Sequence, residues 1–245
     1  RGLIDFSPLV GMRRTKETSR SRVLTDAEIK SFWACMDLDR EDIDIYRLTK
    51  LALKAVLLTG QRPGEVAGML KNEIDGEWWI IPPERSKNRE ENRVPILPMF
   101  AEIIELAGSY NAGSAFVFVS PRSPLYQFKK PAIAKPFAAD LSVSVGAMAN
   151  AIRRHSAEME IPERFTPHDL RRTLRTKLAE LGVSDVIAER VLNHKLQGVL
   201  GIYNRHSYDI EKRQALALWE QRLGEIIEKS QSTSNVIPFG GVRHA

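Results

Sequence analysis

The strongest helix start in the 245-residue chain is at residues 166–172, Thr-Pro-His-Asp-Leu-Arg-Arg. The Thr166 hydroxyl can cap the free N–H groups of a helix, Pro167 suits the first helical position, and Asp169 completes the cap from the third. Leucines then repeat every four residues, at positions 170, 174 and 178, and predict one buried stripe along this helix.

Helical spacing is found on both sides of this segment. Thr25 and Glu28 have the spacing of a capping box at a helix start. From Asp42 to Thr59, apolar residues repeat at intervals of three and four and predict a helix with one apolar face that ends at Gly60. We expect further helices near residues 63–70, 100–106, 143–159, 185–192, 198–203 and 210–228.

One part of the chain has the spacing of strands instead. Residues 73–74, 78–81 and 94–97 are predicted strands, and Asp75-Gly76 is typical of the turn between the first two. A charged segment, 84–93, separates the last two and is expected to form a projecting hairpin. Pro95 places the final strand on an edge, because proline offers no N–H to a neighbour. The predicted fold is mainly α with a small three-stranded antiparallel sheet (α+β).

The composition is that of a globular protein with a modest basic excess. Hydrophobic residues make up 43% of the chain, but the longest apolar runs are far shorter than the ~20 residues of a membrane helix, so no membrane partner is expected. The single cysteine, Cys35, excludes a disulfide framework within the chain and suits the reducing cytoplasm. The net charge of +5 favours a polyanionic partner, although weakly.

Six residues along the chain have side chains suited to phosphate chemistry. They are Arg62, Lys87, His168, Arg171, His194 and Tyr203. Each has an ordinary explanation when it is taken alone: a surface salt bridge with Glu65 for Arg62, a solubilising hairpin charge for Lys87, and a rim position for a lone tyrosine. Tyr208 competes with Tyr203 for the role of nucleophile.

Taken together and in this order, the six residues resemble the catalytic domain of tyrosine recombinases, the phage integrase family. The matching stretches are residues 59–65, Ser86-Lys87 ahead of 93–96, 167–173, 192–194, and Tyr203 nine residues beyond His194. The part that follows Tyr203 looks most like the integrases of satellite phages and genomic islands. Asn193 stands where glycine is commoner in the family, and we expect no consequence for the chemistry from this departure.

The resemblance implies a site-specific DNA recombinase that cleaves and rejoins strands through a 3′-phosphotyrosine on Tyr203, without metal, ATP or other cofactor. Arg62, Arg171 and His194 would bind the non-bridging phosphate oxygens, with Glu65 supporting Arg62. Lys87 would protonate the leaving 5′ oxygen, and His168 would assist proton handling near Tyr203. Further DNA contacts are expected from Arg85, Arg89, Arg93 and Arg172.

The resemblance also implies an organisation and partners. Residues 1–22 are expected to be a basic linker from a missing N-terminal core-binding domain, 23–224 the catalytic domain, and 225–245 a flexible tail that docks on a neighbouring copy. The partners would be double-stranded attachment-site DNA and accessory DNA-bending proteins. We expect a homotetramer on DNA, a monomer without DNA, and a cytoplasmic, nucleoid-associated location in a bacterial host.

Two other functions remain open at this point. A type IB topoisomerase uses a similar set of residues but rejoins the original strand, and a DNA-binding module would use the basic surface without catalysis. A metal site in the acidic stretch 37–44 is disfavoured, because Asp42 stands where a calcium-binding loop needs glycine. We expect this stretch to be a solvated helix start.

Overall fold

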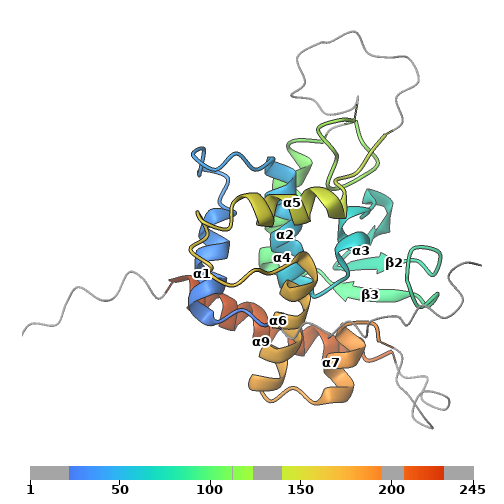
Figure 1. Cartoon of the computed structure of the whole chain (residues 1–245). Coiled ribbons are helices and arrows are strands. Elements are labelled where there is room, and N and C mark those ends of the chain that lie inside the picture. The colour runs from blue at the N-terminus through green and yellow to red at the C-terminus, as the bar shows by residue number, and fades with distance from the viewer. Residues whose placement is uncertain (1–21, 112, 124–139, 195–206, 229–245) are drawn as a thin grey trace, which may run out of the picture.

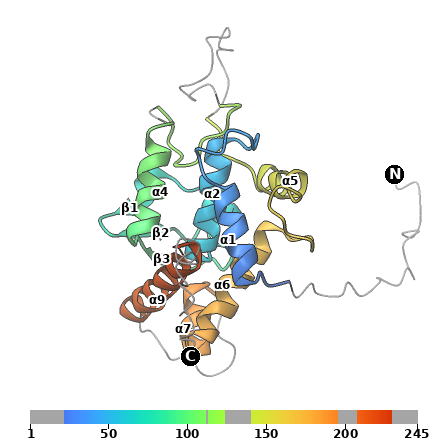
Figure 2. The ribbon, with the colours of Figure 1, turned by 90° about the vertical axis from the view of Figure 1, so that its left-hand side faces the viewer.

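The fold is built around one central helix. The computed structural model describes residues 22–111, 113–123, 140–194 and 207–228, and the mainly helical fold with a small sheet is confirmed (Figure 1). Helix α2 (Arg47–Thr59) lies in the middle of the other helices (Figure 2). Its neighbours are α3 (Pro63–Ala67), α4 (Pro98–Gly108), α5 (Val145–Arg154), α6 (Pro167–Glu180) and α9 (Asp209–Glu228).

Helix α2 differs from its prediction in two ways. It is buried almost all round rather than on one face, because other elements pack on every side of it, and Leu53 and Leu57 are as deeply buried as Leu48. It also begins at Arg47 rather than at Asp42. The Nζ of Lys50 donates to the carbonyls of Asp37 and Arg40, at 2.8 and 2.9 Å, and so holds the preceding segment as a loop.

The acidic stretch 37–44 belongs to this loop, so the expected helix start there is wrong. Arg40 pairs with Asp42 at 2.7 Å instead of leaving it to cap a helix. Within the described part of the chain, no group of three or more His, Cys, Asp or Glu side chains is arranged to hold a metal ion.

Helix α6 begins as its sequence predicts. At its N-cap, the backbone N–H and the hydroxyl of Thr166 both donate to the carboxylate of Asp169, at 2.9 and 2.8 Å, and the three leucines at 170, 174 and 178 are fully buried. The capping box of Thr25 and Glu28 likewise starts α1 (Asp26–Cys35). The backbone N–H of Leu24 donates to the hydroxyl of Thr173 at 2.9 Å and joins the start of α1 to the middle of α6.

The sheet lies at the end of the fold opposite α1 (Figure 1). Its three antiparallel strands are β1 (Ile74–Asp75), β2 (Trp78–Ile81) and β3 (Asn92–Pro95), in that order, so Pro95 lies on an edge strand as predicted. Strand β3 begins and ends two residues earlier than expected, because its register with β2 runs only from the Ile81–Asn92 pair to the Trp78–Pro95 pair.

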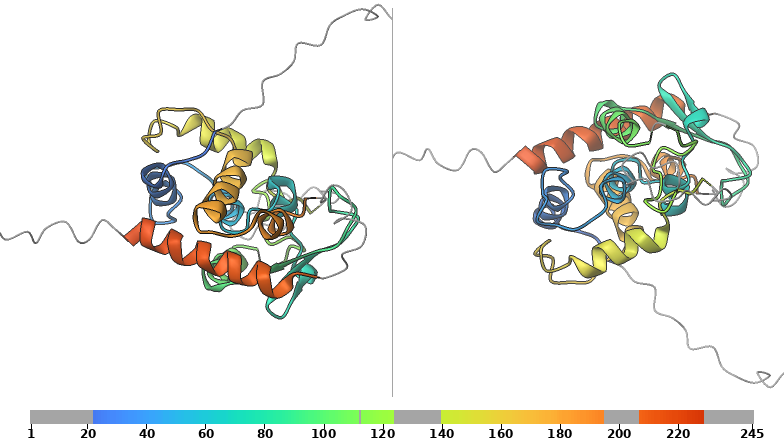
Figure 3. Two further views of the ribbon diagram at one scale, coloured as in Figure 1. Left: turned by 90° about the horizontal axis from the view of Figure 1, so that it is seen from below. Right: turned by 90° about the horizontal axis from the view of Figure 1, so that it is seen from above.

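Helix α9 covers the edge strand. Its Lys212 donates to the backbone carbonyl of Arg93 in β3 at 2.5 Å. The guanidinium groups of Arg93 and Arg213 both lie 4.9 Å from the centre of the Trp78 ring, so the start of α9 is fastened to the sheet. Figure 3 shows α9 (red) and α5 (yellow) on opposite faces of the molecule, with α2 and α6 between them.

Two predicted boundaries need correction. Residues 225–228 are the last turn of α9 rather than the start of a tail, and Ile226 is buried because it extends the apolar face of Leu216, Trp219 and Leu223. At the other end, Arg22 is bound to Glu28 and Glu163 and so is part of the folded domain rather than of a linker.

The other helices keep their predicted places with shifted ends. Helix α3 stops at Ala67 and α4 extends to Gly108. Helix α5 stops at Arg154 and is followed by turns that lead to the buried Met159. Helix α7 (Asp185–Val191) matches its expectation, and the helix expected at 198–203 lies outside the described residues. No helix in the described ranges has both the length and the apolar character needed to cross a membrane.

Helix α9 offers a test of this packing in two adjacent residues. Trp219 is fully buried and donates from Nε1 to the carbonyl of Leu57 at 3.1 Å, whereas Leu218 is 46% exposed. We expect Trp219→Ala to lower the free energy of unfolding by about 3–5 kcal/mol, because it leaves a cavity and an unpaired carbonyl. Leu218→Ala is the control and should change it by less than about 0.5 kcal/mol in urea titrations. Equal losses for the two variants would contradict the packing described.

Candidate active site

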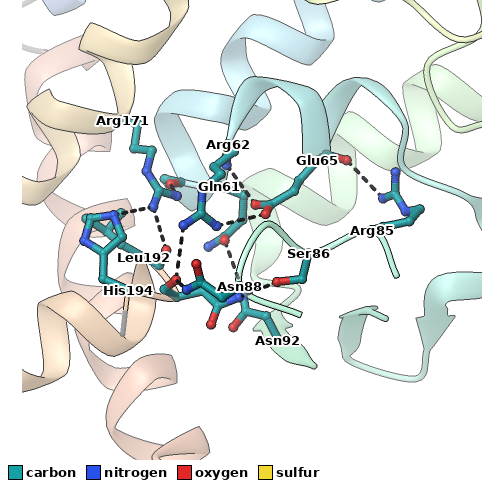
Figure 4. Close-up of polar contacts among 12 residues, drawn as sticks. Gln61, Arg62, Glu65, Arg85, Ser86, Asn88, Asn92, Arg171, Leu192 and His194 are labelled. Carbon is teal, nitrogen blue, oxygen red and sulfur yellow. Dashed lines mark hydrogen bonds and ion pairs between the residues drawn. The ribbon is translucent and has the colours of Figure 1, made fainter. Parts of the chain in front are cut away.

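The site is centred on the buried guanidinium of Arg171, in the first turns of α6. Its side chain donates from Nη1 to the carbonyl of Gly60 at 2.5 Å and from Nη2 to the carbonyl of Leu192 at 2.6 Å. Nη2 also lies 2.8 Å from Nε2 of His194. Gly60 is the C-cap of α2 and Leu192 is the C-cap of α7, so one cation joins the ends of two helices (Figure 4).

Gly60 is required at this junction for two reasons. Its φ of 66° lies in the left-handed region, which glycine adopts without steric cost. A Cβ at this position would also come within 2.9 Å of methyl carbons of Leu174 and Leu192. The absent side chain therefore lets the end of α2 approach α6 and α7 closely enough for Arg171 to reach its carbonyl.

The positive charge of Arg171 is held without a carboxylate contact among the described residues. Burial and the nearby cation of Arg62 lower the pKa of Arg171 to about 10, against the attraction of Glu65 and Glu189. The side chain is thus protonated at neutral pH although only 5% of the residue is exposed. A buried cation with this little direct compensation is suited to receive an anion.

Arg62 lies two residues after Gly60, at the N-cap of α3. Its backbone N–H and its Nη1 both donate to the carboxylate of Glu65, at 3.1 and 2.9 Å, and its Nη2 donates to the carbonyl of Asn193 at 3.3 Å. The buried carboxylate of Glu65 therefore holds the guanidinium on the same side as Arg171, as Figure 4 shows.

His194 lies two residues beyond the C-cap of α7 and faces Arg171. Its Nδ1 is hydrogen-bonded to the carboxylate of Glu189. Because arginine can only donate, Nε2 of His194 accepts from Arg171, and Nδ1 carries the proton that Glu189 binds. A hydrogen bond from His194 to a phosphate oxygen, as expected from the sequence, would require Nε2 to exchange this partner.

The sequence analysis gave Gln61 no role. In the structure, its buried side chain links three segments of the site by hydrogen bonds. Its Nε2 donates to the carbonyls of Thr59 and Val191, both at 2.9 Å, and its Oε1 accepts from the amide of Asn92 at 2.9 Å. The turn that carries Arg62 is thereby fixed to the end of α7 and to the start of β3. The feature of the sequence that could have indicated this role is a polar residue inside the turn from Gly60 to Pro63.

The segment between β2 and β3 brings Lys87 to this side of the fold. The Lys87 side chain is exposed, while its neighbours Ser86 and Asn88 are hydrogen-bonded to Asn193, directly before His194. His168 lies in the first turn of α6. Burial, Arg171, Arg172 and Lys87 lower its pKa below the ordinary 6.5, and Asp169 opposes them.

The four residues expected to contact DNA differ in how far their side chains are exposed. Arg89 is exposed on the hairpin, and Arg172 is more than a third exposed although it is paired with Asp169. Arg85 points inward instead: it binds both carboxylate oxygens of Glu73, at 2.5 and 2.9 Å, and the carbonyl of Glu65 at 3.1 Å. The Arg93 side chain lies beside Trp78 and 3.3 Å from Asp209, and it is 40% exposed.

The sequence model of the phage integrase family matches residues 22–209. The chain belongs to the phage integrase family. A comparison with curated proteins gave no match. Solved structures with a similar fold include a lambda integrase (residues 75–356) dimer bound to a COC′ core site, with a TM-score of 0.56 and 19% identity; the match covers 79% of this chain and 64% of that chain.

Two further structures show the same fold. The lambda integrase catalytic core has a TM-score of 0.52 and 19% identity, and the match covers 71% of this chain and 96% of that one. XerA recombinase has a TM-score of 0.55 and 15% identity, with 87% and 65% covered. The phage integrase domain described here therefore spans about 64% of the length of the lambda integrase dimer's chain.

In this phage integrase domain, three of the six residues predicted from the sequence come together. Arg62, Arg171 and His194 surround one position: one hydrogen bond joins Arg171 to His194, and Arg62 donates to the carbonyl of Asn193, directly before His194. Tyr203 lies outside the described residues. The competing Tyr208 lies at the start of α9, with the guanidinium of Arg190 5.2 Å from the centre of its ring.

The lowered pKa of His168 gives a measurable consequence. Because the folded chain binds this proton less tightly than the unfolded chain, His168 favours folding above about pH 6.5 and this contribution is lost as the pH falls through the folded pKa. We expect an NMR titration of the His168 ring to give a midpoint below 6.5. Lys87→Ala should move that midpoint upward by removing one cation. A wild-type midpoint at or above 6.5 would contradict the environment described.

Proposed function

We propose that the protein is a site-specific DNA recombinase that integrates or excises a mobile element through a 3′-phosphotyrosine intermediate. The observation that carries the proposal is the convergence of Arg62, Arg171 and His194 around one position, in a domain of the phage integrase family. Arg171 supplies a buried cation and Arg62 a second guanidinium, which is the arrangement that a phosphodiester under attack requires.

In the proposed reaction, the hydroxyl oxygen of Tyr203 attacks the phosphorus atom and the bond to the 5′ oxygen breaks. The new negative charge develops on the non-bridging oxygens, where Arg62 and Arg171 bind it with planar N–H donors. Arg171 has five N–H donors and its three contacts do not exhaust them. The step conserves the bond energy in a phosphotyrosine, so a second 5′ hydroxyl can reverse it.

Two residues manage the protons in this proposal. Lys87, exposed on the hairpin, gives its proton to the leaving 5′ oxygen. Burial and the cations around it hold the pKa of His168 below its ordinary value, so its neutral ring can accept the proton of the Tyr203 hydroxyl. Glu65 and Glu189 do not meet the substrate in this scheme: they hold Arg62 and His194 by the hydrogen bonds described above.

We further propose attachment-site DNA as the partner, contacted by Arg89 and Arg172, with four copies acting on two duplexes. Supporting examples of the fold are a lambda integrase tetramer bound to a Holliday junction and the Tn1549 transposon integrase in complex with circular intermediate DNA. For Arg85 we propose a structural role instead, because its guanidinium group is bound to both carboxylate oxygens of Glu73. Arg93, whose side chain is 40% exposed, stays among the proposed DNA contacts. We also propose that residues 1–21 are a linker, that DNA-bending proteins are partners, and that the protein is associated with the nucleoid.

Trapping the covalent intermediate tests the proposal directly. Nicked duplexes tiled across both ends of the element that carries the gene lose a short strand on cleavage, so the protein–DNA adduct cannot revert. We expect wild type and Tyr208→Phe to give an adduct that survives denaturant, and Tyr203→Phe to give none. An adduct that persists in Tyr203→Phe and is lost in Tyr208→Phe would move the nucleophile. Absence of any adduct would overturn the recombinase proposal.

A second prediction concerns the planar guanidinium group of Arg62. Arg62→Lys keeps the charge but cannot bind two oxygens in one plane, so adduct formation should slow by about 10²–10³-fold. The circular dichroism spectrum and the thermal midpoint serve as controls that the fold is kept. An unchanged rate in a folded Arg62→Lys variant would show that Arg62 does not bind the reacting phosphate.

A further inference from the structure

Asn193 has an uncommon backbone conformation directly before His194. Its φ of 51° lies in the left-handed region, where glycine has no steric cost and asparagine is among the few other residues tolerated. Backbone hydrogen bonds fix this turn: the N–H of Asn193 donates to the carbonyl of Arg190 at 3.1 Å, and that of His194 to the carbonyl of Glu189 at 2.9 Å. A glycine would make the same turn, so the turn alone does not require the asparagine side chain.

The side chain of Asn193 has a partner on another element. Its Nδ2 donates to the hydroxyl of Ser86 at 3.0 Å, and Ser86 is only 4% exposed. Its backbone carbonyl accepts from the side-chain amide of Asn88 and from Arg62. The residues on both sides of Lys87 are therefore bound to Asn193, and Figure 4 shows Ser86 and Asn88 against the turn between Leu192 and His194.

These contacts matter because the sheet does not itself position Lys87. The ladder between β2 and β3 ends at the Ile81–Asn92 pair, and the segment between these residues is a series of turns with local bonds such as Arg89 N–H to the carbonyl of Ser86 at 3.0 Å. A connection of this length outside the ladder is free to move unless other contacts hold it. The bonds to Asn193 are contacts of this kind, and they lead directly to Arg62 and His194.

We propose that Asn193 is a positioning residue that docks the hairpin of Lys87 on the turn of His194, so that the lysine is already beside the reacting phosphate when DNA binds. This inference rests on the proposed function, in which Lys87 is the general acid. It also assigns a consequence to the residue whose departure from glycine was expected to have none. The side chain at 193 supplies a hydrogen bond to Ser86 that glycine cannot make.

The test compares Asn193→Gly, Ser86→Ala and Asn193→Asp with wild type. Asn193→Gly keeps the left-handed turn and removes only the bond to Ser86; Asn193→Asp keeps an oxygen that accepts from the Ser86 hydroxyl. Hydrogen exchange of the DNA-free protein is the first readout. We expect backbone amides of residues 84–91 to exchange faster in Asn193→Gly and Ser86→Ala, and near the wild-type rate in Asn193→Asp, with α6 unchanged in all three variants.

The second readout is the rate of adduct formation on two nicked duplexes, one with an ordinary 5′-bridging oxygen and one with sulfur at that position. A sulfur leaving group needs no proton, so its departure does not depend on the general acid. We expect Asn193→Gly and Ser86→Ala to slow cleavage of the oxygen substrate by about tenfold, part of the 10²–10⁴ that general acids contribute, and to leave the sulfur substrate unchanged. The double variant should be no slower than either single one, since both remove the same bond.

Three results would be decisive against parts of this scheme. Unchanged exchange at residues 84–91 in Asn193→Gly overturns the docking, whatever the activity. Faster exchange with equal slowing of both substrates overturns the positioning of Lys87, because a general loss of site structure would do the same. No adduct from the wild-type protein on either duplex overturns the proposed recombinase function, while the exchange data still decide whether Asn193 holds the hairpin.

Discussion

The burial of one guanidinium group organises this site. A charged side chain removed from water needs hydrogen bonds in compensation, and Arg171 finds them at the carbonyls of Gly60 and Leu192, the C-terminal caps of α2 and α7. Helix C-termini carry partial negative charge, so both are favourable places for a cation. Arg62 and His194 follow these two caps within two residues. Their convergence is thus a consequence of where Arg171 is satisfied.

The compensation is incomplete, and this gives the site its chemical character. Glu65 offsets Arg62, and Glu189 is shared between Arg175 and His194. Burial opposes the charge of Glu189, but the hydrogen bonds from Arg175 and His194 outweigh it, so its pKa lies below the ordinary value. Both acids are bound to side chains other than Arg171. The carboxylates therefore fix the geometry, and the remaining positive charge is available to a bound anion.

What could be predicted from the sequence was the part encoded locally. The caps at Thr25 and Thr166, the left-handed end at Gly60 and the edge position of Pro95 each depend on a few neighbouring residues, and the structure confirms them. The predicted start of α2 was wrong because the buried Lys50 binds two backbone carbonyls of the preceding segment and holds it as a loop. Arg85 was expected to contact DNA, but its guanidinium group is bound to Glu73, and no local pattern in the sequence indicates that contact.

The candidate site shows the same division. The resemblance gave the order of the reactive residues, and the structure places Arg62, Arg171 and His194 together. Gln61 and Asn193 received no role from the sequence, since their hydrogen bonds join turns that are remote along the chain. The role of a polar side chain within a tight turn can be assigned only when the element that faces the turn is known.

The edge of the small sheet has a consequence for how copies of the chain can associate. An unprotected edge strand invites another strand to add to it, which leads to aggregation. In β3, Pro95 offers no N–H, and the carbonyl of Arg93 is already occupied by Lys212 from α9. Another strand could therefore add at the β3 edge only after displacing Lys212 of α9, and even then it would find no N–H donor at Pro95, so the sheets of two copies are kept from merging at this edge.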